Sequence, residues 1–273
     1  MTTRQQEYLL GTHDEEIDRL GLQHRVWRPN VLACWRRAGI TVGSRVLDVG
    51  AGPGYATLDL AEIVGPRGHV VALERSERFV AVAREACARR GLANVEFHER
   101  DLMAGFPPLR DLDAAWCRWV AAFVQSPAKL VGEIASALRP GGVAIFHEYA
   151  HYQSWRLAPR GAAHESFVAE VVRSWRESGG EPNVALELPR LLHEAGFQIE
   201  RLAPLVFVVR PKDFMWLWPA TFVDIHLRHQ VEEGRADPAW ADSVRAEFRD
   251  AEADPASYMI TPLVLEIVAR RNG

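Results

Sequence analysis

A glycine-rich turn, Asp48-Val49-Gly50-Ala51-Gly52-Pro53-Gly54, contains the first residues that could do chemistry. It lies between an apolar run typical of a buried strand and a stretch with helical character. In that setting glycines let the backbone approach a ligand that side chains would hold off. The spacing is GxGxG rather than the GxGxxG of dinucleotide-binding folds, and Asp48 stands two residues before the first glycine. An acid beside the turn is poorly suited to a pyrophosphate and favours a ligand that carries a positive charge.

Two further acidic positions follow the next two predicted strands. Glu74 ends the run 70–73, where a carboxylate could accept hydrogen bonds from both hydroxyls of a ribose. Asp101-Leu102 follows the run 95–98, where an acid could accept from an exocyclic amine. Because open α/β sheets bind ligands at the carboxyl ends of their strands, we expect these acids to serve one ligand. The alternative is that each acid only caps a helix or a turn.

The pentapeptide His147-Glu148-Tyr149-Ala150-His151 matches the HExxH pattern of zinc hydrolases. That chemistry needs both histidines on one face of a helix, with the glutamate activating a metal-bound water. Four apolar residues typical of a strand precede the segment, and strand positions four apart are separated by about 13 Å, too far to share an ion. A helix beginning at His147 would restore the spacing, with Glu165 or Glu170 as a third ligand. A zinc hydrolase is therefore kept only as the alternative, and because no trio of acids indicates a magnesium site either, we predict no metal.

Short apolar runs alternate with helical stretches from residue 45 onward, and this alternation must position the residues above. It predicts helices at 56–64, 76–90 and 127–138, and strands at 46–49, 70–73, 95–98, 114–117 and 143–146. Such alternation indicates right-handed crossovers and a parallel sheet covered on both faces.

The flanking parts of the chain have a different pattern. Before the alternation, the pattern predicts two helices, the second opened by Pro29 and ended at Gly39. After it, the segments 150–195 and 214–249 are predicted to be mostly helical, and longer strands are expected at 197–210 and 261–270.

Together these motifs resemble those of class I S-adenosylmethionine-dependent methyltransferases of the small-molecule type. The resemblance covers about residues 45–149 and rests on the order and spacing of Val46 to Gly54, Glu74, Asp101-Leu102 and Leu138 to Gly142. It implies an α/β fold: a Rossmann-like, doubly wound, seven-stranded sheet with the last strand antiparallel, and helical cap insertions. The strands expected near the C-terminus would complete that sheet.

The resemblance also implies S-adenosyl-L-methionine as the cofactor and suggests residues for each part of it. The glycines would approach the methionine part, Glu74 would hold the ribose, and Asp101 with the Leu102 backbone would hold the adenine. Arg118 could pair with a carboxylate, either that of the cofactor or that of Glu148. The predicted cofactor-binding residues are Tyr8, Asp48, Gly50, Gly52, Gly54, Glu74, Arg75, Asp101, Leu102 and Arg118.

The segment after the fifth strand is expected to lie beside the methyl group. Methyl transfer is an in-line displacement on an activated sulfonium, so positioning and desolvation dominate, and a base helps when the nucleophile is a hydroxyl or a protonated amine. We predict that Glu148 or His151 supplies that base and that Tyr149 orients the substrate. The alternative is that these side chains pair with arginines or cap the following helix.

Aromatic residues are concentrated outside the predicted sheet. They would form either the core of a small helical layer or a cap over a flat, apolar substrate. On the second interpretation, the predicted substrate-binding residues are Trp119, Tyr152, Trp218, Phe222 and His226.

Composition excludes several classes of protein. Lys plus Arg is 32 and Asp plus Glu is 36, so the formal charge is 32 − 36 = −4, which gives no footprint for binding nucleic acid. Trp116 to Trp119 lacks the Asn/Asp-Pro-Pro-aromatic signature of enzymes that methylate nucleobases or glutamine. Three scattered cysteines and the lack of an apolar run of ~18 residues argue against a disulfide framework and a membrane span. We expect a cytoplasmic protein with a small-molecule substrate, and a homodimer is compatible with the sequence.

The whole chain, 1–273, is predicted to form one methyltransferase domain. Its parts are an N-terminal helical lid at 1–42, a cofactor-binding core at 43–149, helical cap insertions at 150–195 and 211–258, and final strands at 196–210 and 259–271. The predicted reaction is methyl transfer to a small aromatic or amphipathic metabolite, with the attacked atom (O, N or C) left open. Besides the zinc hydrolase, the remaining alternative is a cofactor-binding protein without transfer activity.

Overall fold

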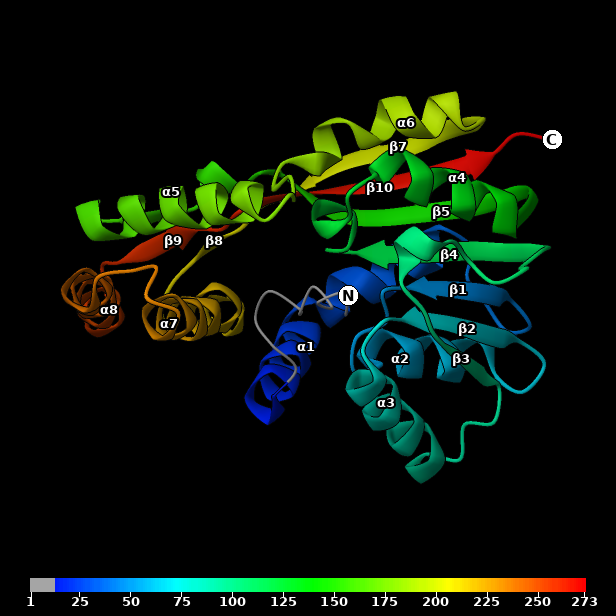
Figure 1. The fold of residues 1–273 in the computed structure, drawn as a ribbon, viewed down its shortest axis with the longest axis horizontal. Helices are drawn as coiled ribbons and strands as arrows, with labels where there is room; N and C mark the ends of the chain where they lie inside the picture. Colours follow the sequence, from blue (N-terminus) through cyan, green and yellow to red (C-terminus); the bar gives the residue numbers. More distant parts are fainter. Residues whose placement is uncertain (1–12) are drawn as a thin grey trace, which may run out of the picture.

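A seven-stranded sheet forms the centre of the molecule in the computed structural model, which describes residues 13–273 (Figure 1). The strand order is β3-β2-β1-β4-β5-β10-β7, and β10 is antiparallel to both of its neighbours while β1 to β5 pair in parallel. The strands are β1 (Arg45–Val49), β2 (His69–Glu74), β3 (Val95–Glu99), β4 (Leu112–Arg118), β5 (Leu138–His151), β7 (Phe197–Leu205) and β10 (Leu263–Arg271). The predicted Rossmann-like sheet with an antiparallel last strand is confirmed.

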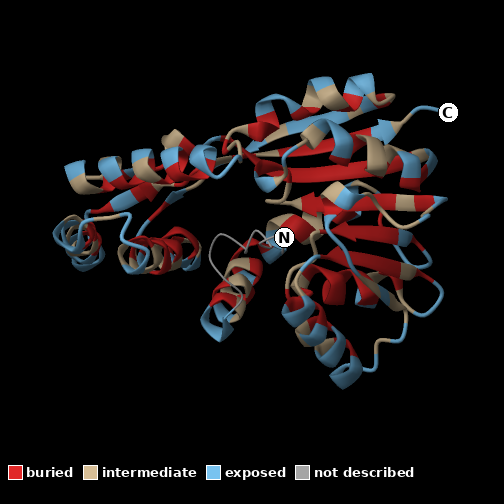
Figure 2. Ribbon diagram, in the orientation of Figure 1, coloured by how far each residue is buried: buried red, intermediate tan, exposed pale blue. Residues whose placement is uncertain are grey.

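Helices cover both faces of this sheet, because successive side chains of a strand point to opposite sides. Val46 packs in one cluster with Trp27 of α1, whereas the next residue, Leu47, packs in a second cluster with Leu130 of α4. In Figure 2 the buried positions accordingly run along the central strands. The helices are α1 (Asp14–Arg37) and α2 (Tyr55–Val64) on the first face, α4 (Pro127–Ala137) and α6 (Leu188–Glu194) on the second, and α3 (Glu77–Arg89) against α2, β2 and β3.

A cap extends from the carboxyl end of β5, on the left in Figure 1. It contains α5 (Ala162–Glu177), α7 (Leu217–Glu232), α8 (Pro238–Ala253) and a small sheet of β6 (Arg156–Ala158), β9 (Tyr258–Ile260) and β8 (Val208–Val209). Buried cap residues such as Phe167 and Phe248 belong to the same hydrophobic cluster as Trp27 and Val46. The cap and the α1 face of the main sheet therefore share one core.

Strand pairing moves several boundaries away from those that the sequence predicts. β5 continues to His151 instead of ending at Phe146, because β10 pairs with it along that whole length. β7 ends at Leu205, and the chain then leaves the main sheet so that β8 can pair with β9 in the cap. The small cap sheet itself was not predicted.

Two helical expectations also change. Residues 14–37 form one helix with Pro29 inside it rather than two helices, because the buried contacts of Val26, Trp27 and Val31 hold it on both sides of the proline. Of the helical segment 150–195, α5 lies in the cap, whereas α6 packs on α4 and β7 through Leu188 and Leu192. Among residues 13–273, no helix is both long enough and apolar enough to cross a membrane.

Candidate functional site

The glycine turn between β1 and α2 exposes backbone in a conformation that other residues rarely adopt. Gly50 and Gly52 have φ angles of +68° and +57°. A Cβ atom on Gly50 would lie 2.4 Å from Cγ2 of Val120, so only glycine fits there. A Cβ on Gly52 would meet nothing within 4 Å, so this side of the turn is open to a ligand.

Glu74, at the end of β2, ties this turn to the next one. Its Oε2 accepts a hydrogen bond from the Gly52 amide and its Oε1 accepts one from the Ser76 amide, each at 2.9 Å. Burial raises the pKa of the Glu74 carboxyl, although the backbone amides act in the opposite direction. The carboxylate is therefore held at the strand edge, and each oxygen still has acceptor capacity for a ligand hydroxyl.

The other predicted acids lie at the same edge but differ in exposure. The Arg100 amide donates to the Glu74 carbonyl at 2.7 Å, so Asp101 follows directly beside Glu74. Asp101 is exposed and accepts from the Met103 amide at 2.8 Å, capping the short helix that begins at the buried Leu102. Arg75 is exposed. Asp101 thus also performs the capping role that the sequence left as the alternative.

Asp48 is directed toward α2 and away from solvent. Its Oδ2 accepts a hydrogen bond from the Thr57 hydroxyl at 2.6 Å. Burial raises the pKa of Asp48 to about 6, although the Thr57 hydrogen bond and the charge of Arg118 oppose that shift. Asp48 therefore acts on the glycine turn mainly through its charge and its hydrogen bond to α2.

Arg118, at the end of β4, places a cation between the glycine turn and the cap. Its Nη2 donates to Nδ1 of His24 at 3.2 Å, and its guanidinium carbon lies 5.0 Å from the centre of the Trp119 ring. Its Nη1 is buried and has no hydrogen-bond partner among the described residues. Burial lowers the pKa of Arg118 to about 10, so the group stays charged at neutral pH. The sequence left two carboxylates for Arg118, that of the cofactor and that of Glu148; the hydrogen bonds of Arg118 among the described residues run to His24, and none runs to Glu148.

Glu148 is fully buried and holds the backbone that follows β4. Its Oε1 accepts from the amides of Val120 and Ala121 at 2.7 and 2.8 Å. Burial raises the pKa of Glu148 to about 8, although the same amides act in the opposite direction. These contacts support a role in positioning the turn beside Gly50 and do not support the predicted role as a base.

Tyr149, the next residue, points to the opposite face and contributes to an aromatic pocket. Its ring is stacked on Trp119, with centroids 5.6 Å apart and planes 16° apart, and Trp119 is stacked on Trp218 at the same distance. The hollow among these rings is small: its interior measures about 20 Å³, and the free space including its open mouth is about 240 Å³. Its lining residues are Gln23, Tyr149, Tyr152, Trp155, Trp218, Pro219, Phe222 and Pro262.

Trp119 is held at the border of this pocket in an unusual backbone conformation. Its φ is +53°, in the left-handed region, and its amide donates to the His147 carbonyl at 3.0 Å. Non-glycine residues in this region cost free energy and are concentrated at functional sites. The turn after β4 therefore presents the Trp119 ring between Arg118 and the stacked aromatic side chains.

Two predicted site residues lie away from the pocket. His226 is buried among cap aromatics, 5.1 Å from the Phe222 ring and 5.7 Å from the Phe167 ring, and does not line the hollow. His151 is exposed at the end of β5 and does not line it either. Tyr8 belongs to residues 1–12, which lie outside the described part of the chain.

The HExxH-like segment does not have the geometry of a zinc site. It lies on β5, with His147 buried against α1 and His151 exposed, so the helical arrangement that the zinc hypothesis needs is absent. The suggested third ligands, Glu165 and Glu170, pair with Arg160 and Arg173. The zinc-hydrolase alternative is therefore wrong.

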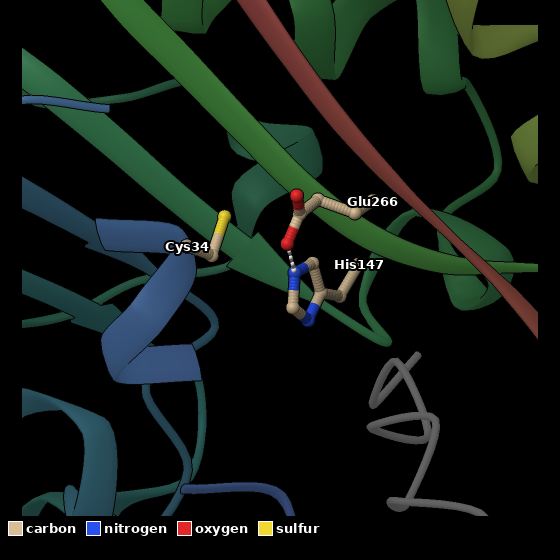
Figure 3. A group of neighbouring side chains, drawn as sticks. All are labelled: Cys34, His147 and Glu266. Carbon is tan, nitrogen blue, oxygen red and sulfur yellow. Dashed lines mark hydrogen bonds and ion pairs between the residues drawn. The ribbon is translucent and has the colours of Figure 1, made fainter. Parts of the chain in front are cut away.

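A different trio, Cys34, His147 and Glu266, brings ligand-type atoms within 4.8 Å of one another (Figure 3). Glu266 is already paired: it accepts from Arg37 at 2.8 and 2.9 Å and from Arg201 at 2.5 Å. Burial alone would raise the pKa of Glu266, but hydrogen bonds from His147 and both arginines hold it well below its usual range. Burial raises the pKa of the Cys34 thiol far above its ordinary value. The trio is therefore part of an ion-pair cluster that joins α1 to the sheet rather than a metal centre.

Sequence reasoning missed a buried polar chain behind Arg118. It consists of His24 on α1 and Asp59 on α2, with Arg28 bonded to Asp59 at 2.8 Å. The only signal in the sequence is the spacing of His24 and Arg28, four residues apart on one helical face. Gln23, which lines the pocket, was also missed.

Comparison with known sequences gives the family relationship. Residues 40–192 match the model of a family described as a methyltransferase domain. A demethylmenaquinone methyltransferase from Lactococcus lactis subsp. lactis (strain IL1403) is 30% identical over 47% of this chain and 50% of its own length. The chain therefore spans about half the length of that relative. A demethylmenaquinone methyltransferase from Geobacillus kaustophilus (strain HTA426) is 28% identical over 68% of this chain and 83% of its length.

Comparison with solved structures concerns the fold. The [4+2]-cyclase SpnF superposes with a TM-score of 0.58 at 23% identity, over 88% of this chain and 79% of that one. Phosphoethanolamine N-methyltransferase 2 from Haemonchus contortus, in complex with S-adenosyl-L-methionine, has a TM-score of 0.58 at 20% identity, over 99% of this chain and 59% of that one. At such identities the likeness shows a shared fold and leaves the chemistry to the residues of this site.

Proposed function

The chain belongs to the methyltransferase domain family, and from that premise we propose that it transfers a methyl group from S-adenosyl-L-methionine to a small aromatic or amphipathic metabolite. One observation carries the proposal: Arg118, which follows the strand paired with β1 and lies against the Trp119 ring, has a buried Nη1 without a partner among the described residues. A guanidinium N–H without a partner is a strong donor to a carboxylate, and the pocket next to it suits a flat apolar ring.

The residues at the strand ends fit the methyl donor part by part. The open backbone at Gly52 would accommodate the methionine part, while Gly50 and Gly54, packed against Val120 and Ala83, would shape the turn. Arg118 would pair with the carboxylate of the methionine part. Glu74 would accept from the ribose hydroxyls and Asp101, with the Leu102 backbone, would bind the adenine, with Arg75 beside them. When bound, the cofactor supplies a methyl group activated by a positively charged sulfur.

The aromatic pocket would bind the substrate. Tyr149, Trp119 and Trp218 present stacked rings against which a planar substrate could pack once the small hollow widens. Tyr152 and Phe222 complete the wall on the cap side. We propose that α1 and the cap act as the lid that encloses the substrate.

The lining of the pocket also bears on the attacked atom. No acid and no histidine is among the described residues that line the hollow. A nucleophile that needs little help from a base, such as an activated ring carbon or a neutral amine, fits this environment best. The names of the two quinone-pathway relatives are consistent with a ring substrate. The role of His151 as a base stays a prediction.

Cofactor binding by titration calorimetry tests the proposal. We expect S-adenosylmethionine to bind the parent protein, and Glu74→Ala and Asp101→Ala to weaken it about tenfold or more, because each removes a charge-assisted hydrogen bond. Glu194→Ala, on an exposed residue of the distant α6, is the matched control and should bind like the parent. Absence of binding to the parent protein would overturn the proposal.

A second candidate, a cofactor-binding protein without transfer, follows from the same pocket lining that offers no base. A screen with a labelled methyl donor against aromatic metabolites separates the two. Transfer of label to any of them establishes the enzyme, whereas tight cofactor binding with no transfer across the screen favours the second candidate.

A further inference from the structure

A buried chain of hydrogen bonds runs from α2 through α1 to Arg118. Nε2 of His24 lies 2.9 Å from Oδ2 of Asp59, and Nδ1 of His24 lies 3.2 Å from Nη2 of Arg118. His24 and Asp59 are 5% and 6% exposed, so this contact is shielded from solvent. Neither residue touches the aromatic pocket, and neither belongs to the glycine turn.

We propose that His24 and Asp59 are a positioning pair that fixes the Arg118 guanidinium so that its free N–H faces the carboxylate of the methyl donor. This inference rests on the proposed function and adds two residues that act through Arg118. They are positioning residues, because their contacts run to Arg118 and α2 rather than to the ligand.

The chemistry of the three groups determines which atom donates in each contact. An ionised Asp59 only accepts, so the proton of a neutral His24 must be on Nε2. Arginine only donates, so Nδ1 of His24 must be the acceptor for Arg118. The two contacts therefore demand the same tautomer, and Asp59 selects it. This agreement is what makes the pair able to orient the guanidinium.

Tying down Nη2 leaves Nη1 as the group that a ligand can use. Nη1 has no partner among residues 13–273, and Oδ2 of the nearby Asp48 accepts from the Thr57 hydroxyl. The Trp119 ring, 5.0 Å from the guanidinium carbon, limits its movement on another side. A planar fork held at one nitrogen and by a ring has few orientations left, so less entropy is lost when a carboxylate binds.

The charges around His24 predict how this device responds to acid. The titratable and charged groups that face it are Asp59 and Tyr55 from α2, Arg28 from its own helix and Arg118 from β4, with Asp48 of β1 beyond Arg118. Burial lowers the pKa of His24, and Arg118 and Arg28 add to that shift while Asp59 opposes it. Protonation would place a donor on Nδ1 opposite the Arg118 donor and a second positive charge beside it. The contact would then break and release the guanidinium.

Calorimetry with two ligands tests the pair. S-adenosylhomocysteine carries the amino-acid carboxylate, whereas 5′-methylthioadenosine has the same nucleoside and sulfur without it. We expect His24→Leu to weaken S-adenosylhomocysteine about tenfold and to leave 5′-methylthioadenosine within about twofold, because only the first ligand uses Arg118. His24→Gln should recover most of the loss, since an amide offers a donor to Asp59 and an acceptor to Arg118.

Each outcome decides a separate question. Equal losses for both ligands, or no loss for either, would overturn the positioning role. A parent protein that binds neither ligand would instead contradict the proposed function itself. If His24→Leu fails to fold, the comparison of His24→Gln with the parent protein still decides the matter through pH.

The pH profile is the second readout. In the parent protein we expect the affinity for S-adenosylhomocysteine, relative to 5′-methylthioadenosine, to fall as the pH drops into the acidic range where His24, whose pKa burial lowers, takes up a proton. In His24→Gln that ratio should stay flat over the same range. If the ratio of the two affinities still falls with pH in His24→Gln as it does in the parent protein, the titrating group is Asp48 and the inference is overturned.

Discussion

Glu148 illustrates, at the scale of a single residue, how burial decides what a carboxylate does. Its place in an HExxH-like pattern and after a sheet strand suggested a metal activator or a base, yet its oxygen accepts from two backbone amides. Glu148→Gln keeps an acceptor for the amides of Val120 and Ala121, so we expect cofactor binding and methyl transfer near the parent level. Glu148→Leu removes the acceptor, and this variant should lose both cofactor binding and methyl transfer. A Gln variant that binds cofactor normally but loses transfer would contradict the positioning role and restore the base.

The raised pKa of Glu148 gives a second prediction at this scale. The folded state holds its proton until about pH 8, whereas an unfolded glutamate releases it near pH 4.5. Because the folded pKa is the higher one, this stabilisation is complete below pH 4.5 and is lost as the pH rises through 8. The parent protein should therefore lose stability relative to Glu148→Gln between pH 5 and pH 8, on the order of 4 kcal/mol at most. Urea unfolding at both pH values measures the difference. If the free energy of unfolding changes equally with pH in the two proteins, the prediction is refuted.

At the scale of elements, the turn after β4 and the glycine turn after β1 fit against each other. Val120 fills the space where a Gly50 side chain would go, and Glu148 holds Val120 there through its amide. Gly50→Ala should therefore destabilise the protein by about 1–3 kcal/mol more than Gly52→Ala, which shares the positive φ but has open space.

Chemical denaturation compares the two glycine variants, and a double variant provides the control. Gly50→Ala combined with Val120→Ala should recover part of the lost stability, because the smaller side chain makes room for the new methyl group. Gly52→Ala should instead weaken cofactor binding, since its methyl group extends into the ligand side. Similar unfolding free energies for Gly50→Ala and Gly52→Ala would contradict the close packing of the two turns.

At the scale of the whole molecule, one hydrophobic core joins the cap to the sheet and contains two histidines. Neither ring nitrogen of His164 or His226 has a hydrogen-bond partner among the described residues, and burial lowers the pKa of each to about 4. Their folded pKa is below the unfolded 6.5, so the unfolded state takes up protons first and stability falls as the pH drops below 6.5. Each of the two histidines should therefore lower the free energy of unfolding by about 2 kcal/mol between pH 7 and pH 5.

His226→Leu tests this shared core directly. Between pH 7 and pH 5, the two histidines lower the free energy of unfolding of the parent protein, and in the variant this decrease should be about half as large. Urea unfolding at both pH values measures it. The unfolding transitions followed by far-ultraviolet circular dichroism and by tryptophan fluorescence should coincide, because the cap and the sheet share their core. An unchanged pH dependence, or separate unfolding of the two signals, would contradict the arrangement.

Local patterns in the sequence were sufficient to predict the parallel strands and the edge at which the candidate site lies, and the family resemblance added the antiparallel last strand. Continuous apolar runs predict β1, β2, β4 and β5 because a parallel strand buried on both faces requires them, whereas the edge strand β3 follows from alternating residues. The glycine turn, Glu74 and Asp101 follow from the same logic, since a ligand edge requires bare backbone and acceptors at strand ends. None of these inferences needs a contact between distant segments.

The tertiary structure alone decided which partner each side chain has. β5 extends through His151 because β10, more than a hundred residues later, pairs with it, and this pairing excludes the helix that a zinc site needs. Glu148 reaches the turn after β4, and His24 on α1 meets Asp59 on α2 and Arg118 on β4. Hydrogen bonding and burial depend on contacts between residues that are far apart in the chain. Local residue type and spacing do not show which of these residues come into contact. Residue type and spacing therefore predicted where the candidate site lies, and packing determined which partners its residues have.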